Sequence, residues 1–253
     1  IVDHGSRSCQ KPQAQSKITQ TESPSHLRPA TKTVTEAATN MPRYIVVEGP
    51  IGVGKTSLAK RLAHSFNYET LLEKAEENPF LDRFYHNPRQ HALATQLFFL
   101  FQRAQQLQQL RQNDLFEPVR VADFLIEKDR LFAKLNLDVD EYRLYENVYD
   151  HLTIDAPKPD LVIYLQAPVE ILLQRIHKRG IASEQMISGE YLANLVNIYT
   201  EFFHYFEKST LLVVNSTDVN FVRSDEDYEL LLRHIRGMRT GTRNYFNPRP
   251  SLL

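Results

Sequence analysis

The sequence is poor in cysteine, in net charge and in long apolar runs, and each shortage excludes a class of protein. Cys9 is the only cysteine, so the chain can form neither an internal disulfide nor a metal site of several cysteines, which fits a reducing compartment. Lys and Arg number 30 against 31 Asp and Glu, so no overall positive field attracts the chain to nucleic acid or to an anionic membrane. No apolar stretch approaches the roughly 18 residues of a transmembrane helix. We therefore expect a cytoplasmic protein whose partners are neither nucleic acids nor membranes.

Residues 1–40 differ in composition from the rest of the chain. They hold five Ser, six Thr and three Pro, and they show no regular apolar spacing. A segment of this kind buries too little surface to offset the entropy lost on ordering, so we expect a disordered leader. A further hypothesis is that translation begins at Met41 and that the leader is not part of the native protein; an organelle transit peptide is the weaker alternative.

From residue 41 onward, short apolar runs alternate with stretches of helical periodicity. The apolar runs predict five strands, at residues 44–47, 68–73, 119–124, 161–165 and 211–214. Apolar residues at three- and four-residue steps predict helices at residues 55–66, 88–111, 131–149, 169–176, 191–208 and 225–236. This order predicts an α/β fold, a five-stranded parallel sheet with helices on both faces. We expect one domain over residues 41–236 and a flexible C-terminal tail over residues 237–253.

The turn after the first expected strand carries a phosphate-binding pattern. Three of the eight glycines lie in it, in the sequence Gly49-Pro50-Ile51-Gly52-Val53-Gly54-Lys55-Thr56-Ser57. Glycines let backbone N–H groups curl around a phosphate, and the start of the following helix adds partial positive charge. Lys55 would reach the β- and γ-phosphates, and the Thr56 hydroxyl would ligate Mg²⁺. We therefore predict binding of ATP with Mg²⁺ at residues 49–57.

This loop is shared by kinases, GTPases and ATP-driven machines, so other residues must separate them. The Asn-Lys-x-Asp stretch with which GTPases read their base is absent from the sequence. A kinase of small molecules needs an acceptor pocket and arginines that close over the transferred phosphoryl group.

Four segments with specific spacing resemble the deoxynucleoside kinases, and most closely the bacterial deoxyadenosine/deoxyguanosine/deoxycytidine kinase branch. They are residues 49–56, Glu73 within residues 72–79, Tyr85 through Gln96, and Arg175 through Tyr191, and the resemblance covers nearly all of residues 43–222. It implies a P-loop kinase fold with an Arg-containing lid. It also implies a phosphotransferase with an alcohol acceptor: ATP phosphorylates the 5′-hydroxyl of a deoxyribonucleoside, in nucleotide salvage. The residues do not indicate which base is preferred.

The resemblance assigns roles to matching residues of the acceptor site. Glu73 would accept the proton of the 5′-hydroxyl, although an exposed glutamate in an acidic run is an equal alternative from the sequence alone. Tyr85 would hydrogen-bond the sugar 3′-hydroxyl, and Gln96 would present its amide to the base. Arg103 matches a pocket arginine of the family, with a surface ion pair as the alternative.

The lid residues follow from the same resemblance. Arg175 and Arg179 lie four residues apart on one expected helix, and with Lys55 and Glu73 they form the predicted catalytic set. Glu184 would take the second hydrogen bond from the 3′-hydroxyl. Tyr191 would also line the sugar site.

The sequence departs from the family after the third expected strand. Relatives carry an acid-Arg-Ser triplet there, whereas this chain has Ala122-Asp123-Phe124. We expect Asp123 to serve as the carboxylate near hydrated Mg²⁺, displaced by one residue through a bulge. Lys128 replaces an acid that helps relatives read the base. Arg130 and Lys128 are the two candidates for restoring the lost positive charge.

Two other functions remain open from the sequence. One is a nucleoside monophosphate kinase of the thymidylate kinase type, for which Arg83 and Arg89 would have to bind the acceptor phosphate. The other is a nucleotide-binding regulatory protein of low activity. The expected helix at residues 88–111 is apolar on more than one side because of Phe98, Phe99 and Phe101, so we also expect a homodimer.

Overall fold

A computed structural model describes residues 41–112, 119–152, 156–239 and 241–248; the expected leader and Cys9 lie outside these residues. The described residues form a six-stranded, entirely parallel sheet in the order β2-β3-β1-β4-β5-β6. The strands are β1 Tyr44–Glu48, β2 Glu69–Leu71, β3 Arg120–Ala122, β4 Leu161–Gln166, β5 Thr210–Asn215 and β6 Arg243–Phe246. The predicted α/β fold with a parallel sheet is confirmed.

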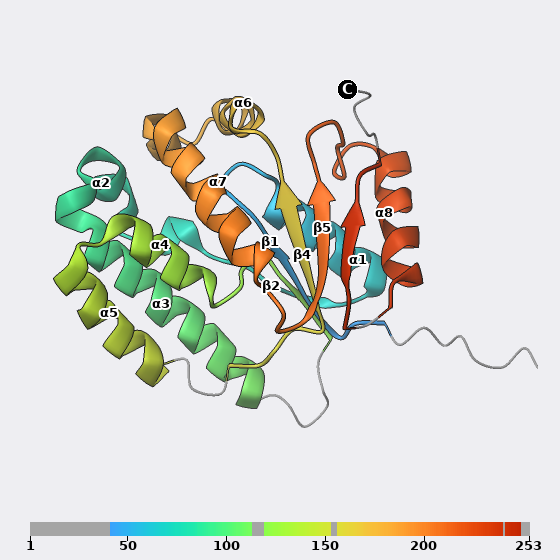
Figure 1. The fold of residues 1–253 in the computed structure, drawn as a ribbon, viewed down its shortest axis with the longest axis horizontal. Helices are drawn as coiled ribbons and strands as arrows, with labels where there is room; N and C mark the ends of the chain where they lie inside the picture. The colour runs from blue at the N-terminus through green and yellow to red at the C-terminus, as the bar shows by residue number, and fades with distance from the viewer. Residues whose placement is uncertain (1–40, 113–118, 153–155, 240, 249–253) are drawn as a thin grey trace, which may run out of the picture. The chain divides into compact units, whose positions relative to one another are not determined.

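Helices connect consecutive strands and cover both faces of the sheet. They are α1 Lys55–Phe66, α2 Leu81–His86, α3 Pro88–Gln112, α4 Lys128–Asn136, α5 Val139–Leu152, α6 Val169–Arg179, α7 Gly189–His204 and α8 Asp225–Gly237, with short 3₁₀ turns η1 Ala75–Glu77 and η3 Ser183–Met186. Figure 1 shows α1 and α8 against one face of the sheet and α4 and α7 against the other. No helix among the described residues is long and apolar enough to span a membrane.

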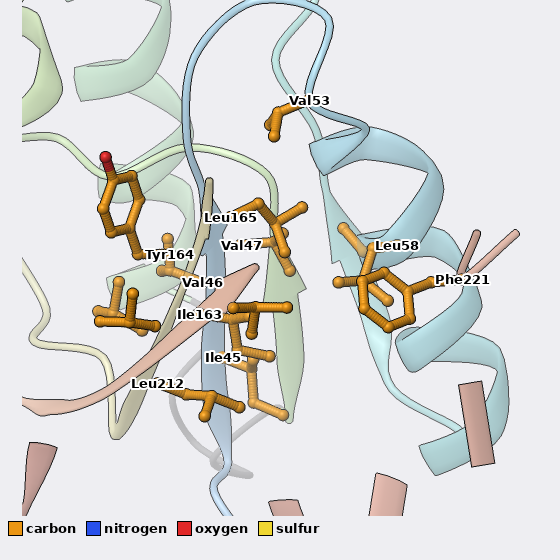
Figure 2. Packing of buried hydrophobic residues seen from close by; sticks show 14 of the residues in the cluster. Ile45, Val46, Val47, Val53, Leu58, Ile163, Tyr164, Leu165, Leu212 and Phe221 are labelled. Atoms are coloured by element: carbon orange, nitrogen blue, oxygen red, sulfur yellow. The ribbon is translucent and has the colours of Figure 1, made fainter. Parts of the chain in front are cut away.

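The core lies between the central strands and these helices because the middle strands are apolar on both sides. Ile45, Val46 and Val47 of β1 are fully buried, as are their neighbours in β4. On one face, the rings of Tyr164 in β4 and Tyr199 in α7 stack. Figure 2 shows the apolar side chains of β1 and β4 packed together, with Val53 of the following loop above the strand ends. The phosphate loop is therefore anchored directly on the core.

The prediction of five strands and a flexible tail was wrong in one respect. Part of the expected tail forms β6, which pairs in parallel with the outer edge of β5. Phe246 of β6 packs against Phe221 and His234, so its ring is buried although its neighbours are exposed. A four-residue edge strand with one buried side chain has almost no alternating pattern, which explains why periodicity missed it.

The predicted helix over residues 131–149 is two helices. The backbone becomes extended at Leu137, and Asp138 accepts hydrogen bonds from the N–H groups of Asp140 and Glu141, which begins α5. The helix α2 was not predicted, since six residues are too few to show a helical period. The strand expected over residues 68–73 ends at Leu71, two residues before Glu73.

Candidate active site

The carboxyl ends of three neighbouring strands bring the candidate residues together. In the order β2-β3-β1, these strands lead into Glu73, Asp123 and the phosphate loop. Ligands of open parallel sheets bind at this edge, where the loops of adjacent strands diverge. The residues predicted from distant parts of the sequence therefore meet at one end of the sheet.

The phosphate loop turns so tightly that two of its glycines cannot be replaced without a clash. Gly49 and Gly52 have φ angles of +150° and +84°. A Cβ on Gly49 would lie 2.5 Å from the carbonyl oxygen of Leu165 in β4, and one on Gly52 would lie 2.9 Å from that of Leu172 in α6. The loop backbone therefore lies directly against β4 and α6.

The end of this loop exposes groups suited to a triphosphate. Gly54 precedes α1, and no side chain caps the helix start, so its first N–H groups point toward the loop. The Lys55 ammonium donates to the carbonyl oxygens of Gly49 at 2.8 Å and Pro50 at 3.2 Å. Burial and the nearby Lys128 ammonium lower the pKa of Lys55. These features agree with the predicted binding of phosphates at residues 49–57.

A cleft of about 460 Å³ opens on one side of the loop. Residues 52–58, from the loop and the first turn of α1, line it together with the segment after β5 and the basic side chains Arg175, Lys178, Arg179 and Arg223. Arg175 is held at its wall, donating to the carbonyl oxygen of Ser216 at 2.6 Å and to that of Val53 at 3.3 Å. The cleft has the size and charge for a nucleotide triphosphate.

A second pocket, of about 160 Å³, lies on the other side of the loop. Every residue predicted for the acceptor lines it, namely Glu73, Tyr85, Gln96, Arg103, Glu184 and Tyr191. The two cavities share Gly52, Lys55, Thr56 and Arg179, so they meet at the end of the phosphate loop. Lys55 therefore lines both cavities, at the point where they meet.

Glu73 faces this second pocket and contacts two cations. Its side chain is 16% exposed, so it is not the exposed glutamate that the acidic run allowed. One carboxylate oxygen accepts from Arg103, and the other accepts from Lys128 at 2.7 Å. Burial alone would raise the pKa of Glu73, but Arg103 and Lys128 lower it to about 2. The carboxylate is therefore ionised at neutral pH and held by each oxygen.

Arg103 also bonds a second carboxylate, that of Asp129 at the start of α4. Both side chains are buried, at 3% and 2% exposed, so the surface ion pair allowed for Arg103 is excluded. Burial raises the pKa of Asp129 to about 6, although Arg103 acts in the opposite direction. Asp129 Oδ2 and Thr95 Oγ1 have no hydrogen-bond partner among the described residues. Asp129 and Thr95 both line the pocket, so it offers polar atoms to a ligand.

Asp123 connects the phosphate loop to Glu73. It accepts from the Thr56 hydroxyl at 2.5 Å through one oxygen and from the Glu73 backbone N–H at 2.7 Å through the other. The register of β3 with β1 and β2 is regular through Ala122, and the Asp123 N–H continues it by bonding Leu71. Asp123 therefore reaches Thr56 without the expected bulge in the paired part of β3.

The end of α6, the turn η3 and the start of α7 also line the second pocket, through Arg179, Glu184 and Tyr191. Arg179, at the end of α6, forms an ion pair with Glu184 of η3. Tyr191, in the first turn of α7, accepts from the Asn136 side-chain amide at 3.3 Å, and its ring contacts that of Phe84. Burial raises the pKa of Tyr191 to about 12 and raises that of Tyr85 further, so both phenols are protonated donors.

Sequence reasoning missed one charged residue of this pocket, Asp129, and offered three arginines that do not line it. Asp129 was missed because the helix was predicted to begin at residue 131, whereas α4 begins at Lys128. Lys128 was one of the two candidates for restoring the lost positive charge, and the structure places it in the pocket beside Glu73. The signal that could have identified Asp129 is its charge, directly after Lys128 and six residues after Asp123. The alternative cation Arg130 pairs instead with Asp150 on an exposed surface. Arg83 and Arg89, which a monophosphate acceptor would require, are exposed.

Comparisons with known proteins agree with this geometry. A family model described as deoxynucleoside kinase matches residues 45–238. The deoxyguanosine kinase of Bacillus subtilis (strain 168) is 35% identical over 203 residues, which are 78% of this chain and 98% of that protein. The deoxyadenosine kinase of Lactobacillus acidophilus is 29% identical, over 77% of this chain and 95% of that protein.

A solved structure shows the same similarity. The structure of deoxyadenosine kinase from M. mycoides with bound dATP matches with a TM-score of 0.67 at 25% identity, over 77% of this chain and 100% of that one. The family model covers most of the described residues, and the Bacillus relative is covered almost end to end. This chain belongs to the deoxynucleoside kinase family.

Proposed function

We propose that this chain transfers the γ-phosphoryl group of ATP to the 5′-hydroxyl of a deoxyribonucleoside and releases the monophosphate and ADP. The observation that carries this proposal is the arrangement of two cavities that meet at Lys55, with the ionised Glu73 in the smaller one. The larger cleft suits the triphosphate, and the smaller pocket suits an uncharged sugar alcohol.

The geometry supports a direct in-line transfer. The 5′-oxygen forms a bond to the γ-phosphorus while the bond from that phosphorus to the bridging oxygen of ADP breaks, and the hydroxyl proton passes to Glu73. Because the pKa of Glu73 is held near 2, its carboxylate stays ionised and accepts a hydrogen bond that orients the hydroxyl. Lys55 and Arg179 line both cavities, so their charges stabilise the transferred group from the shared boundary. Arg175 lines the donor cleft, where it acts on ATP.

Thr56 and Asp123 supply the donor set that Mg²⁺ prefers. Their oxygens are 2.5 Å apart, both line the acceptor pocket, and hydroxyl and carboxylate oxygens are ligands for this hard cation. We propose that Thr56 and Asp123 hold the hydrated ion together with the phosphates of ATP. Bound there, Mg²⁺ would neutralise charge on the β- and γ-phosphates.

The base of the acceptor would lie between Gln96 and Asp129. The rings of Phe99 and Phe132 also line this part of the pocket and offer apolar faces for a planar base. We propose a purine deoxyribonucleoside as the preferred acceptor, in keeping with the deoxyguanosine and deoxyadenosine kinases to which the chain is similar. Tyr85 and Glu184 would bind the 3′-hydroxyl, as the resemblance implies.

Two further parts of the proposal concern assembly and location. Phe101 on α3 is 54% exposed and Leu144 on α5 is 52% exposed, and these helices pack on one another, so their outer faces suit a homodimer interface. Sedimentation at micromolar concentration tests this, and a monomer would contradict it. The single cysteine supports a cytoplasmic location.

The test of function is ADP release by the purified chain. ATP and Mg²⁺ are supplied with deoxyguanosine, deoxyadenosine, deoxycytidine or thymidine, with the matching ribonucleosides, and with thymidine monophosphate as separate acceptors. We expect turnover with a purine deoxyribonucleoside and formation of its 5′-monophosphate. Turnover only with thymidine monophosphate would favour the monophosphate kinase. Tight ATP binding without ADP release would favour the regulatory protein.

A further inference from the structure

Lys128, to which the proposed reaction assigns no step of its own, lies inside the acceptor pocket. Lys128 is the first residue of α4, its side chain is 4% exposed, and it lines the pocket beside Glu73. Its ammonium donates to Glu73 Oε2 at 2.7 Å. The ammonium lies over the ring of Phe132, 5.9 Å from the ring centroid.

This placement is unfavourable for the fold taken alone. Burying an ammonium group is unfavourable unless it is paired, and a lysine stem is long enough to reach solvent from most helix positions. A positive charge in the first turn of a helix is also opposed by the helix dipole. Lys134, on the last turn of the same helix, is exposed and shows the ordinary arrangement. The pocket, rather than the helix, accounts for the position of Lys128.

The two cations on Glu73 divide its oxygens between them. Arg103 from α3 bonds Oε1 and Lys128 from α4 bonds Oε2, and Arg103 is itself held by Asp129. Each carboxylate oxygen accepts two hydrogen bonds, so one site on each remains for a substrate hydroxyl. If Lys128 were absent, the carboxylate could turn toward the arginine, whose guanidinium can bind both oxygens.

We propose that Lys128 is a positioning residue for the acceptor carboxylate: it holds Glu73 Oε2 so that the free lone pairs face the 5′-hydroxyl. This proposal rests on the proposed function, since it assigns a role within that reaction. A small rotation of the reacting group is enough to lower the rate about 100-fold, because transfer requires a near-linear alignment.

The test compares variants of Lys128 with a matched control on the same helix. We expect Lys128→Met to lower kcat about 10- to 100-fold with an unchanged KM for ATP, because the phosphate loop is untouched. Lys128→Arg, which keeps the charge and the N–H donors, should recover most of kcat. Lys134→Met should behave as the unsubstituted chain. If Lys128→Met does not fold, Lys128→Gln, with a polar end, takes its place with the same expectation.

A double substitution asks whether Lys128 acts through Glu73. In a chain that already carries Glu73→Gln, the addition of Lys128→Met should lower kcat little further, because there is no carboxylate left to position. If the double variant loses kcat by the product of the two single fold-changes, the proposal is overturned. An unchanged kcat in Lys128→Met or Lys128→Gln would also overturn it, as would a failure of Lys128→Arg to recover activity. These results require an active unsubstituted chain. If that chain phosphorylates no deoxyribonucleoside, it is the proposed function that fails.

Discussion

Arg103 joins the carboxylates of Glu73 and Asp129, is itself 3% exposed, and its removal gives the sharpest prediction about stability. In Arg103→Met, Glu73 keeps Lys128 as a partner, whereas Asp129 loses the arginine on which its ionised form depends. Breaking one buried ion pair typically costs about 3–5 kcal/mol, because the remaining carboxyl group is either charged without its partner or has to bind a proton. We therefore expect the free energy of unfolding at pH 7 to fall by about that amount.

A matched control separates burial from the loss of an arginine. Arg130 also pairs with an aspartate, Asp150, but these side chains are 41% and 66% exposed. An exposed pair contributes about 0–1 kcal/mol, so Arg130→Met should change the free energy of unfolding by no more than about 1 kcal/mol. Urea unfolding of both variants gives the comparison. Equal losses in the two variants would refute the electrostatic account of the pocket.

The loss in Arg103→Met should also depend on pH. Burial already places the pKa of Asp129 near 6, above its ordinary value of 3.8, and removal of the arginine raises it further. Between 3.8 and the folded pKa, the folded variant binds a proton that the unfolded chain does not, so its stability increases as the pH falls through this window. The difference in the free energy of unfolding between Arg103→Met and the unsubstituted chain should therefore become smaller as the pH falls from 8 to 5. A gap that widens toward pH 5 would contradict this reasoning.

Three further predictions concern ligand binding. Asp123→Asn should raise the Mg²⁺ concentration that gives half-maximal activity by about 10- to 100-fold, measured as ADP release in a Mg²⁺ titration; an unchanged titration would remove Asp123 from the metal site. Tyr85→Phe should reduce the preference for a deoxynucleoside over its 3′-deoxy analogue about fivefold in kcat/KM, since one hydrogen bond to the 3′-hydroxyl is lost. Gly49→Ala should abolish binding of a fluorescent ATP analogue, because its Cβ would lie 2.5 Å from a backbone oxygen of β4; retained binding would show that the loop can shift.

The parts of the fold that could be predicted from the sequence are those with a strong local signal. The central strands are short runs of apolar residues, and the phosphate loop combines glycines with a lysine and a threonine at a known spacing. The break between α4 and α5 at Leu137 and the edge strand β6 depend on a single cap and a single buried ring. A single capping residue or a single buried ring is too small a pattern to be distinguished from the rest of the sequence.

The acceptor pocket was predictable only in part, for a different reason. Glu73, Tyr85 and Gln96 could be named because their spacing resembles that of a family. Lys128 replaces a residue of that pattern, and its role depends on the start of α4 lying beside Glu73. The carboxylate of this chain, Asp123, lies one residue after the position of the family's acid, Ala122. Which of these two residues faces Thr56 depends on the register of β3 with its neighbouring strands. The roles of Lys128 and Asp123 therefore depend on contacts between elements that are far apart in the chain.

The central claim is that Glu73 orients an uncharged 5′-hydroxyl opposite a triphosphate held by the phosphate loop. The most direct measurement is the single-turnover rate of Glu73→Gln, with ATP and the best deoxyribonucleoside both saturating. This substitution keeps the size of the side chain and removes its charge. The account predicts a rate lowered by about 100-fold or more, with ATP bound as tightly as by the unsubstituted chain. A Glu73→Gln variant that retains the full rate would contradict it.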